Sequence, residues 1–235
     1  SFKYKFIFIK TYKTAGSSIE NYLYPYLNKK DILAPTQDYN GINCWGDFDV
    51  KKIKDHFSKE SLIKKINYKM NYFAHMPIWL VKDRLMPLSE KLNYDIFENF
   101  YKFGVIRNPF DTIVSHYYWV NSKNTKKNLK LISFDEILKE LESNTFPQYG
   151  LLNLNKLMDK NYNEVLCNKI IKYENLNKEL SIVFKKLGIN FNGKLEIFKK
   201  KSKNRQHYRN YFNKDSQKLI TDIFWKDFEI FNYRY

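Results

Sequence analysis

Apolar residues in this chain gather in short runs that are separated by longer segments of helical periodicity. Four runs have the length and composition of buried strands, and they cover residues 5–10, 71–75, 101–106 and 165–172. Helical spacing predicts helices over residues 17–27, 78–85, 110–121, 134–142, 148–159, 176–187 and 214–228. Strands that alternate with helices are typical of an α/β fold, so we predict three layers: a mostly parallel central sheet flanked by helices.

The chain of 235 residues is long enough to bury a substantial core, and it shows no repeat, low-complexity tract or clear linker. We therefore predict a single domain over residues 1–235. No run of about 18 apolar residues predicts a membrane span, and residues 1–5 lack the apolar region of a signal peptide. These features predict a cytoplasmic protein.

The first predicted strand ends in the polar segment Lys13-Thr14-Ala15-Gly16-Ser17-Ser18, which leads directly into a helix. Helix N-termini offer N–H groups to anions, a glycine allows close approach, and a lysine adds charge. A nucleoside-triphosphate loop would place its lysine after the second glycine. Here Lys13 precedes Gly16, which argues against a nucleoside triphosphatase.

The third predicted strand ends at Arg107, and Asn108 and Pro109 turn the chain into the next helix. An arginine at a strand end is suited to bidentate binding of a phosphate. Ser115 follows about two helical turns later, and the turn at Pro109 allows both side chains to reach one phosphate. Since ligands of parallel sheets bind at the carboxyl ends of the strands, we expect both corners to face the same ligand.

These two corners resemble known motifs of the sulfotransferases. Residues 13–18 resemble the 5′-phosphosulfate loop, and residues 103–118 resemble the 3′-phosphate segment. Further similarities follow the family's order along the chain. His75-Met76-Pro77 resembles a segment of the polysaccharide-type members, and residues 170–176, Lys200–Asn204 and Asp227–Tyr233 resemble later elements of the family. The resemblance implies a P-loop-like sulfotransferase fold. It also implies transfer of a sulfuryl group from 3′-phosphoadenosine 5′-phosphosulfate to a hydroxyl or amine, with a glycan as the expected acceptor and adenosine 3′,5′-bisphosphate as the product.

The resemblance also assigns roles to residues. Lys13 is expected to neutralise charge on the leaving phosphate, and His75 to act as the general base, with His116 as its rival. Tyr173 is expected near the adenine, and the late basic loop is expected to close over the nucleotide. The predicted cofactor-binding residues are Lys13, Thr14, Ala15, Gly16, Ser17, Ser18, Arg107, Ser115, Tyr173, Lys201, Ser202 and Lys203.

Four positions depart from the family's pattern. Lys10 and Tyr12 stand where the family has histidine and proline, and Asn232 and Ala74 stand where glycine is usual. These departures are compatible with cofactor binding and concern the acceptor side. A member that binds the nucleotide without catalysis is therefore an alternative.

The net charge of +16 and the pI near 9.5 raise the alternative of a basic nucleic-acid-binding module. Lysine supplies most of the basic residues, however, and abundant Lys, Asn, Ile, Phe and Tyr are typical of AT-rich coding, so nucleic acid is not the expected partner. A nucleotide kinase-like phosphotransferase is a further alternative. Two cysteines and four scattered histidines predict neither a disulfide framework nor a metal site.

Overall fold

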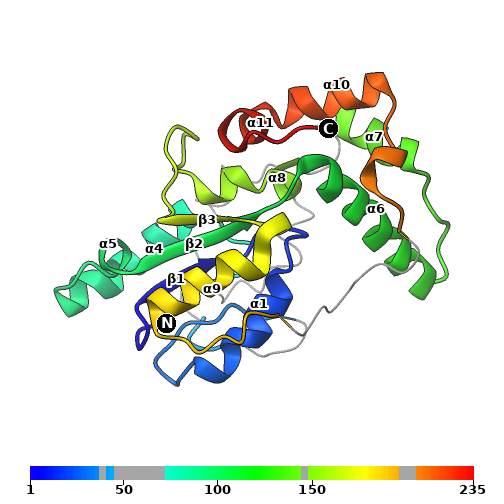
Figure 1. Cartoon of the computed structure of the whole chain (residues 1–235). Helices are drawn as coiled ribbons and strands as arrows, with labels where there is room; N and C mark the ends of the chain where they lie inside the picture. Colours follow the sequence, from blue (N-terminus) through cyan, green and yellow to red (C-terminus); the bar gives the residue numbers. More distant parts are fainter. Residues whose placement is uncertain (37–40, 45–71, 144–147, 196–204) are drawn as a thin grey trace.

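The centre of the computed structural model is a parallel sheet. The structure describes residues 1–36, 41–44, 72–143, 148–195 and 205–235. In these residues the sheet has the order β1-β2-β3, built from β1 (Phe6–Ile9), β2 (Tyr101–Ile106) and β3 (Lys169–Lys172) (Figure 1). Phe103 of β2 is in register with Phe8 on one side and Lys169 on the other. The carboxyl ends of all three strands therefore lie at one edge, as predicted for an α/β fold.

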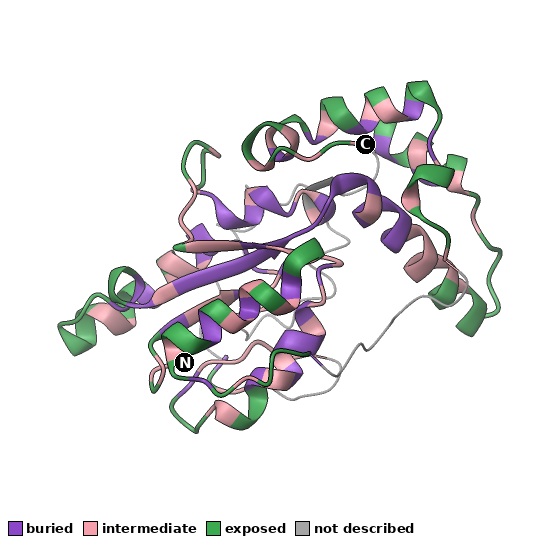
Figure 2. Cartoon of the chain, in the orientation of Figure 1, coloured by how far each residue is buried: buried purple, intermediate pink, exposed green. Residues whose placement is uncertain are grey.

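Helices cover both faces of the sheet. On one face, α1 (Gly16–Leu23) and α9 (Leu176–Leu187) pack on a cluster that includes Phe103 and Val105 of β2. On the other face, α4 (Ile78–Leu92), α5 (Ile96–Asn99) and the 3-10 turn η2 (Leu154–Leu157) pack against Ile106. Figure 2 shows β2 buried along most of its length between these layers. The predicted three-layer arrangement is confirmed.

Gly104 allows η2 to approach the sheet closely. A Cβ at this position would lie 2.4 Å from Cδ2 of Leu157, far inside van der Waals contact. Leu157 is fully buried in the same cluster as Ile106. Any larger side chain at position 104 would therefore push η2 away from the central strand.

A second group of helices lies beyond the carboxyl ends of the strands. It contains α6 (Pro109–Lys126), α7 (Phe134–Glu142), α8 (Gln148–Leu151), α10 (Lys214–Ile223) and α11 (Trp225–Phe231). Phe110, at the start of α6, is buried in an aromatic cluster with Phe212, Phe228 and Tyr235. This cluster ties the C-terminal residues to the corner that follows β2. In the ribbon, the C-terminus lies close to the start of α6 (Figure 1).

The structure corrects four predicted elements. Described residues 72–75 do not form a strand. Ala74 and His75 lie in a turn instead, because His75 is left-handed (φ 65°) and the N–H of Met76 donates to the carbonyl of Phe73. The predicted strand over 165–172 is shorter, and Val165 instead forms an isolated bridge with Met158. The predicted helices over 148–159 and 214–228 are each divided in two, the second at Phe224, into α10 and α11.

The remaining short elements connect these layers. They are the 3-10 turns η1 (Tyr24–Tyr26), η3 (Tyr173–Asn175) and η4 (Tyr208–Asn210). Asn232 ends α11 in the left-handed conformation (φ 50°, ψ 40°). Asparagine tolerates this region better than other non-glycine residues, which explains how it can replace the glycine of the family pattern.

Asp227 is a buried acid in α11, and its burial has a consequence for stability. Its side chain is 4% exposed, and burial raises its pKa from 3.8 to about 7. Between pH 4 and 7 the folded protein keeps the Asp227 proton, whereas the unfolded chain releases it. The free energy of unfolding should therefore fall as the pH rises through this range.

We expect Asp227→Asn to flatten this pH dependence and to stabilise the protein at pH 8 by on the order of 3 kcal/mol. Urea denaturation at pH 5 and pH 8 measures the effect, with the exposed Asp222→Asn on α10 as the control. A variant at position 227 that keeps the wild-type pH profile would contradict this account.

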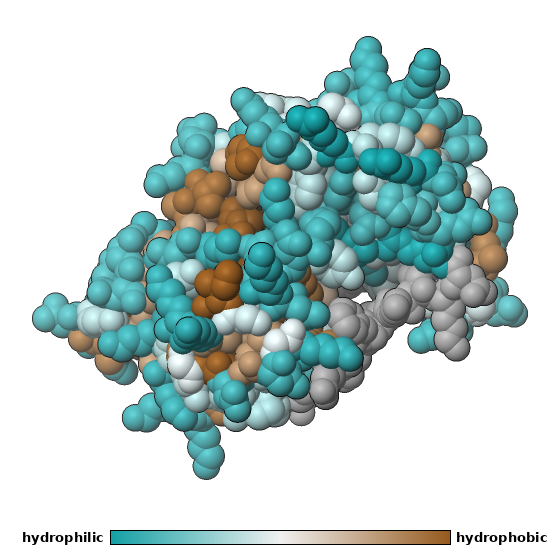
Figure 3. All heavy atoms as spheres, viewed as in Figure 1, coloured by the Kyte–Doolittle hydropathy of each residue, from teal (hydrophilic) through white to brown (hydrophobic). Residues whose placement is uncertain are grey.

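One face of the molecule is mostly hydrophilic (Figure 3). In the face shown in Figure 3, hydrophilic side chains dominate, and the hydrophobic patches are small and separated. Among the helices that the structure describes, none combines the length and the apolar character needed to cross a membrane.

Candidate functional site

The corner between β1 and α1 is a strained, tightly bonded loop. Lys13 and Ala15 both have a left-handed backbone (φ 61° each), which bends the chain sharply before α1. Below them, the hydroxyl of Thr14 lies 2.7 Å from that of Thr11, and the Thr11 hydroxyl donates to the carbonyl of Val105 in β2. Both threonines are buried, so the Thr14 hydroxyl holds the loop on the sheet.

The backbone of this loop leads into the N-terminus of α1. The first intrahelical donor is Ser18, whose N–H bonds the carbonyl of Ala15 at 2.9 Å. The N–H groups of Gly16 and Ser17 precede it, where a helix has no carbonyl to accept them. With the positive end of the helix dipole, these two N–H groups next to Lys13 are suited to bind an anion.

The corner between β2 and α6 holds a buried arginine. The Arg107 side chain is 8% exposed, and its Nε donates to Asp111 at 2.6 Å. Its Cζ lies 4.1 Å from the centre of the Tyr173 ring. Burial lowers the pKa of Arg107, while nearby Tyr173, Glu174 and Tyr233 oppose that shift.

Arg107 also joins the two corners. Its Nη1 donates to the carbonyl oxygen of Lys13 at 2.9 Å, across 94 positions in the sequence. The two segments that the sequence pointed to therefore contact each other directly. Ser115 lies further along α6 and is also buried.

A second arginine reaches the same place from the C-terminal part of the chain. Arg205 pairs through Nη2 with Asp111, whose carboxylate thus binds both arginines. Burial is the main cause that lowers the pKa of Arg205 to about 10, and the Arg107 charge adds to it. Two guanidinium groups that are held close together by one carboxylate offer N–H donors of the kind that bind a phosphate. No local sequence pattern singled out Arg205, because its partner Asp111 lies 94 positions away.

Glu174 ties this corner to the C-terminal segment. Its Oε1 accepts from the N–H of Asn108 at 2.7 Å, and its Oε2 accepts from the Tyr233 hydroxyl at 3.0 Å. The Asn108 amide also donates to the carbonyl of Arg234 at 3.3 Å. Burial, with the Glu174 carboxylate, raises the pKa of Tyr233, so this phenol stays a donor.

We expect Tyr233→Phe and Glu174→Ala each to lower the free energy of unfolding by about 1 kcal/mol. Because both remove the same hydrogen bond, the double variant should cost less than the sum. Urea denaturation of the four proteins in a double-mutant cycle measures this coupling, and the exposed Glu229→Ala serves as the control. Strict additivity would show that the bond contributes nothing.

The Tyr12 ring contacts both His75 and His116. The Tyr12 ring centre is 5.5 Å from that of His75 and 5.7 Å from that of His116. The Tyr12 hydroxyl and Nδ1 of His116 share a hydrogen bond of 3.2 Å. Burial, together with the charges of Lys13 and Lys123, lowers the pKa of His116 to about 3. His116 is therefore a very weak base.

The hydrogen bond of His75 defines its tautomer. Nδ1 lies 3.2 Å from the carbonyl oxygen of Lys10, and a carbonyl can only accept. Nδ1 therefore carries the proton, and in the neutral ring Nε2 is the basic nitrogen. His75 lies in a turn. The sequence had predicted that it would lie at the end of a strand.

Asn153 accommodates Tyr12 in the loop. Its Oδ1 accepts from the N–H of Tyr12 at 2.6 Å, and its Nδ2 donates to the carbonyl of Tyr12 at 2.9 Å. A proline at position 12 would have no N–H, so the change to tyrosine adds a donor that Asn153 satisfies. Asn153 is 3% exposed and lies 141 positions away, which placed it beyond the reach of sequence patterns.

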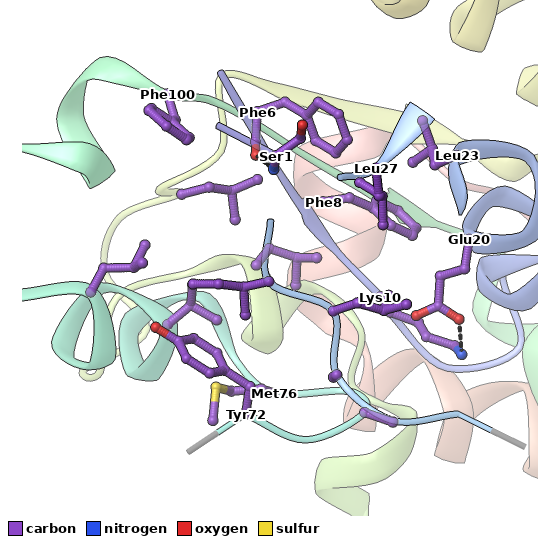
Figure 4. Close-up of a pocket in the computed structure, with 18 of the residues that line it drawn as sticks. Ser1, Phe6, Phe8, Lys10, Glu20, Leu23, Leu27, Tyr72, Met76 and Phe100 are labelled. Carbon is purple, nitrogen blue, oxygen red and sulfur yellow. Dashed lines mark hydrogen bonds and ion pairs between the residues drawn. The ribbon is translucent and has the colours of Figure 1, made fainter. Parts of the chain in front are cut away.

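A cavity of about 150 Å³ runs along β1 and ends beside the loop. Lys10 and Glu20 lie together at one end as an ion pair, and Ser1, Phe6 and Phe100 lie toward the other (Figure 4). Most of its lining is apolar, and His75 also lines it. Lys10 packs on the loop itself, because a Cβ added to Gly16 would lie 2.7 Å from the Lys10 Cγ.

The structure thus brings Lys13, Arg107 and Tyr173 together, and it places His75 against Tyr12. Three predicted cofactor-binding residues, Lys201, Ser202 and Lys203, lie outside the described residues. Within the part of the chain that is described, no three His, Cys, Asp or Glu side chains gather in a way that could hold a metal ion.

Two solved structures are similar to this chain. The chain is similar in fold to mouse sulfotransferase SULT7A1 complexed with PAP, with a TM-score of 0.50 at 16% identity over 96% of this chain and 84% of that one. It also matches a sulfotransferase from Alicyclobacillus acidocaldarius, with a TM-score of 0.45 and 14% identity over 97% of this chain and 96% of that chain.

In sequence, it is 34% identical to an uncharacterized protein of Archaeoglobus fulgidus over 116 residues, which cover 48% of this chain and 83% of that protein. The model of the sulfotransferase family matches residues 1–234, which is almost the whole chain. The chain therefore belongs to the sulfotransferase family, and Arg107 joins the two corners of its parallel sheet.

Proposed function

We propose that this protein transfers a sulfuryl group from 3′-phosphoadenosine 5′-phosphosulfate to the hydroxyl of an acceptor. The observation that carries the proposal is the hydrogen bond from Arg107 to the Lys13 carbonyl, which brings the 5′ corner and the 3′ corner against each other. A ligand with phosphate groups at both ends of one nucleoside fits two such corners. The mouse structural relative is a complex with PAP, which supports the same class of nucleotide.

The residues present fit such a donor. Arg107 and Arg205 would bind the 3′-phosphate, with Asp111 holding both guanidinium groups in place beforehand. Tyr173 stacks on Arg107 and would lie beside the nucleoside. At the other end, Lys13 and the N–H groups of Gly16 and Ser17 would bind the 5′-phosphosulfate.

The chemistry assigned to the chain is proton removal and charge stabilisation. Nε2 of His75 would take the acceptor's hydroxyl proton as the acceptor oxygen bonds to sulfur. Lys13 would stabilise the charge that develops on the bridging oxygen as the sulfur–oxygen bond to the 5′-phosphate breaks. The products are the sulfated acceptor and adenosine 3′,5′-bisphosphate. A glycan acceptor rests on the resemblance of the sequence alone.

Calorimetry with adenosine 3′,5′-bisphosphate tests the donor side of this proposal. We expect one site per chain, with much weaker binding of adenosine 5′-phosphate, which lacks the group that Arg107 and Arg205 would bind. Transfer of labelled sulfate from the donor to an acceptor tests the reaction itself. Salt-sensitive binding of oligonucleotides with no response to the bisphosphate would favour a nucleic-acid-binding module instead.

A further inference from the structure

The cavity along β1 points to the class of acceptor. It lies where an acceptor of the proposed reaction would have to lie, because it is lined by His75 and by Lys10, which packs on Gly16 of the loop. Its volume of about 150 Å³ is similar to that of an apolar cavity that takes up one benzene ring. A single six-membered ring is therefore the size of group that it holds.

The walls of the cavity are suited to an apolar group. Phe8, Leu23 and Leu27 contribute to one side, and Tyr72 and Met76 lie across from them (Figure 4). Apolar walls gain free energy when they cover an apolar ring, whereas the hydroxyls of a sugar ring would lose their hydrogen bonds to water there. This lining favours a hydrophobic ring over a sugar.

The polar end of the cavity is suited to an uncharged hydroxyl. The Lys10 ammonium and the Glu20 carboxylate pair with each other, and their side chains are 11% and 10% exposed. Since the two charges balance, this end offers no net charge to an ionic acceptor. His75 at the same cavity, with its basic Nε2, would accept the proton of a hydroxyl.

Building on the proposed function, we propose that the acceptor is an uncharged hydroxyl compound with one compact hydrophobic ring, such as a simple phenol, whose ring enters the cavity along β1. The hydroxyl then lies at the end formed by His75 and Lys10. The phenolic oxygen forms the new bond to sulfur, its proton passes to His75, and the bond from sulfur to the bridging oxygen of the donor breaks. Atoms and charge balance without a further reactant.

The first test compares three acceptors of similar ring size with labelled donor. They are 4-methylphenol, 4-hydroxybenzoate, which adds a negative charge, and methyl glucoside, which offers a sugar ring. We expect kcat/KM for 4-methylphenol to exceed each of the others at least tenfold. Equal or better use of the charged or the sugar acceptor would overturn the inference.

The second test fills the cavity. Ala34 lines it, so Ala34→Phe should raise the KM for 4-methylphenol about tenfold and leave the Kd for adenosine 3′,5′-bisphosphate within twofold of wild type. Leu131→Phe, at an exposed residue outside the lining, is the matched control and should change neither value. An unchanged KM in a folded Ala34→Phe protein would exclude the cavity as the acceptor site.

The result for the bisphosphate separates this inference from the proposed function. Failure to bind adenosine 3′,5′-bisphosphate would refute the proposed function. If the bisphosphate binds and sulfate reaches only the sugar, the proposed function stands and the phenol inference fails. If no acceptor is sulfated, calorimetric titration of 4-methylphenol into the protein–bisphosphate complex decides, and the absence of binding overturns the inference.

Discussion

Replacement of Arg107 by alanine is expected to weaken the binding of adenosine 3′,5′-bisphosphate by roughly 30-fold to several thousand-fold. Removing one partner of a buried, hydrogen-bonded charge pair costs about 2–5 kcal/mol in binding. The loss has two origins here, because the guanidinium would bind the 3′-phosphate and also holds the Lys13 carbonyl at 2.9 Å. Calorimetry with the bisphosphate measures the effect directly.

Two further variants show which origin dominates. Arg107→Lys keeps the charge but cannot reproduce the planar fork, so its affinity should lie between those of wild type and Arg107→Ala. Arg205→Ala removes the second guanidinium and leaves the bond to Lys13, so it should weaken binding of the bisphosphate less than Arg107→Ala. Wild-type affinity in a folded Arg107→Ala protein would disprove the proposed nucleotide site.

Replacement of His75 by asparagine is expected to reduce kcat by about 10²-fold to 10⁴-fold. Asparagine suits the left-handed backbone at this position (φ 65°) better than alanine does, and its amide can still donate to the Lys10 carbonyl. The variant therefore keeps the turn and removes the base. Affinity for adenosine 3′,5′-bisphosphate should be unchanged.

His116→Asn is the matched comparison for the same assay. His116 shares a hydrogen bond with Tyr12, and its pKa of about 3 makes it a poor proton acceptor. We expect its loss to affect stability more than the chemical step. A large drop in kcat for His116→Asn with a normal rate for His75→Asn would reverse the assignment of the base.

Sequence patterns predicted the local features of this fold well. The strand over 101–106 and the helix over 176–187 have the predicted bounds, because an apolar run before Arg107 and a left-handed Gly188 after the helix are both local signals. The prediction of a strand over 71–75 was wrong for the described residues, 72–75. The aromatic composition of this segment favours a strand, but the left-handed His75 turns the chain.

The contacts that organise the site were not predictable in the same way. Asn153 bonds Tyr12 across 141 positions, and Arg205 bonds Asp111 across 94. No periodicity connects such residues, because the sheet and the helices beyond it bring them together only after folding. Sequence patterns identified the residues within the motifs. They did not identify Asn153 and Arg205, which hold the motifs in place.

In the proposed function, the bond between Arg107 and the Lys13 backbone would link binding of the 3′-phosphate to the position of the loop that would hold the 5′-phosphosulfate. A donor without a 3′-phosphate, such as adenosine 5′-phosphosulfate, would leave Arg107 bonded only to Asp111 and to the Lys13 carbonyl, so no ligand phosphate would contact the arginine that holds the loop. Such a truncated donor should react slowly even when it saturates the protein. Binding of the 3′-phosphate would then be required for efficient transfer of the sulfuryl group from the 5′ end of the nucleotide.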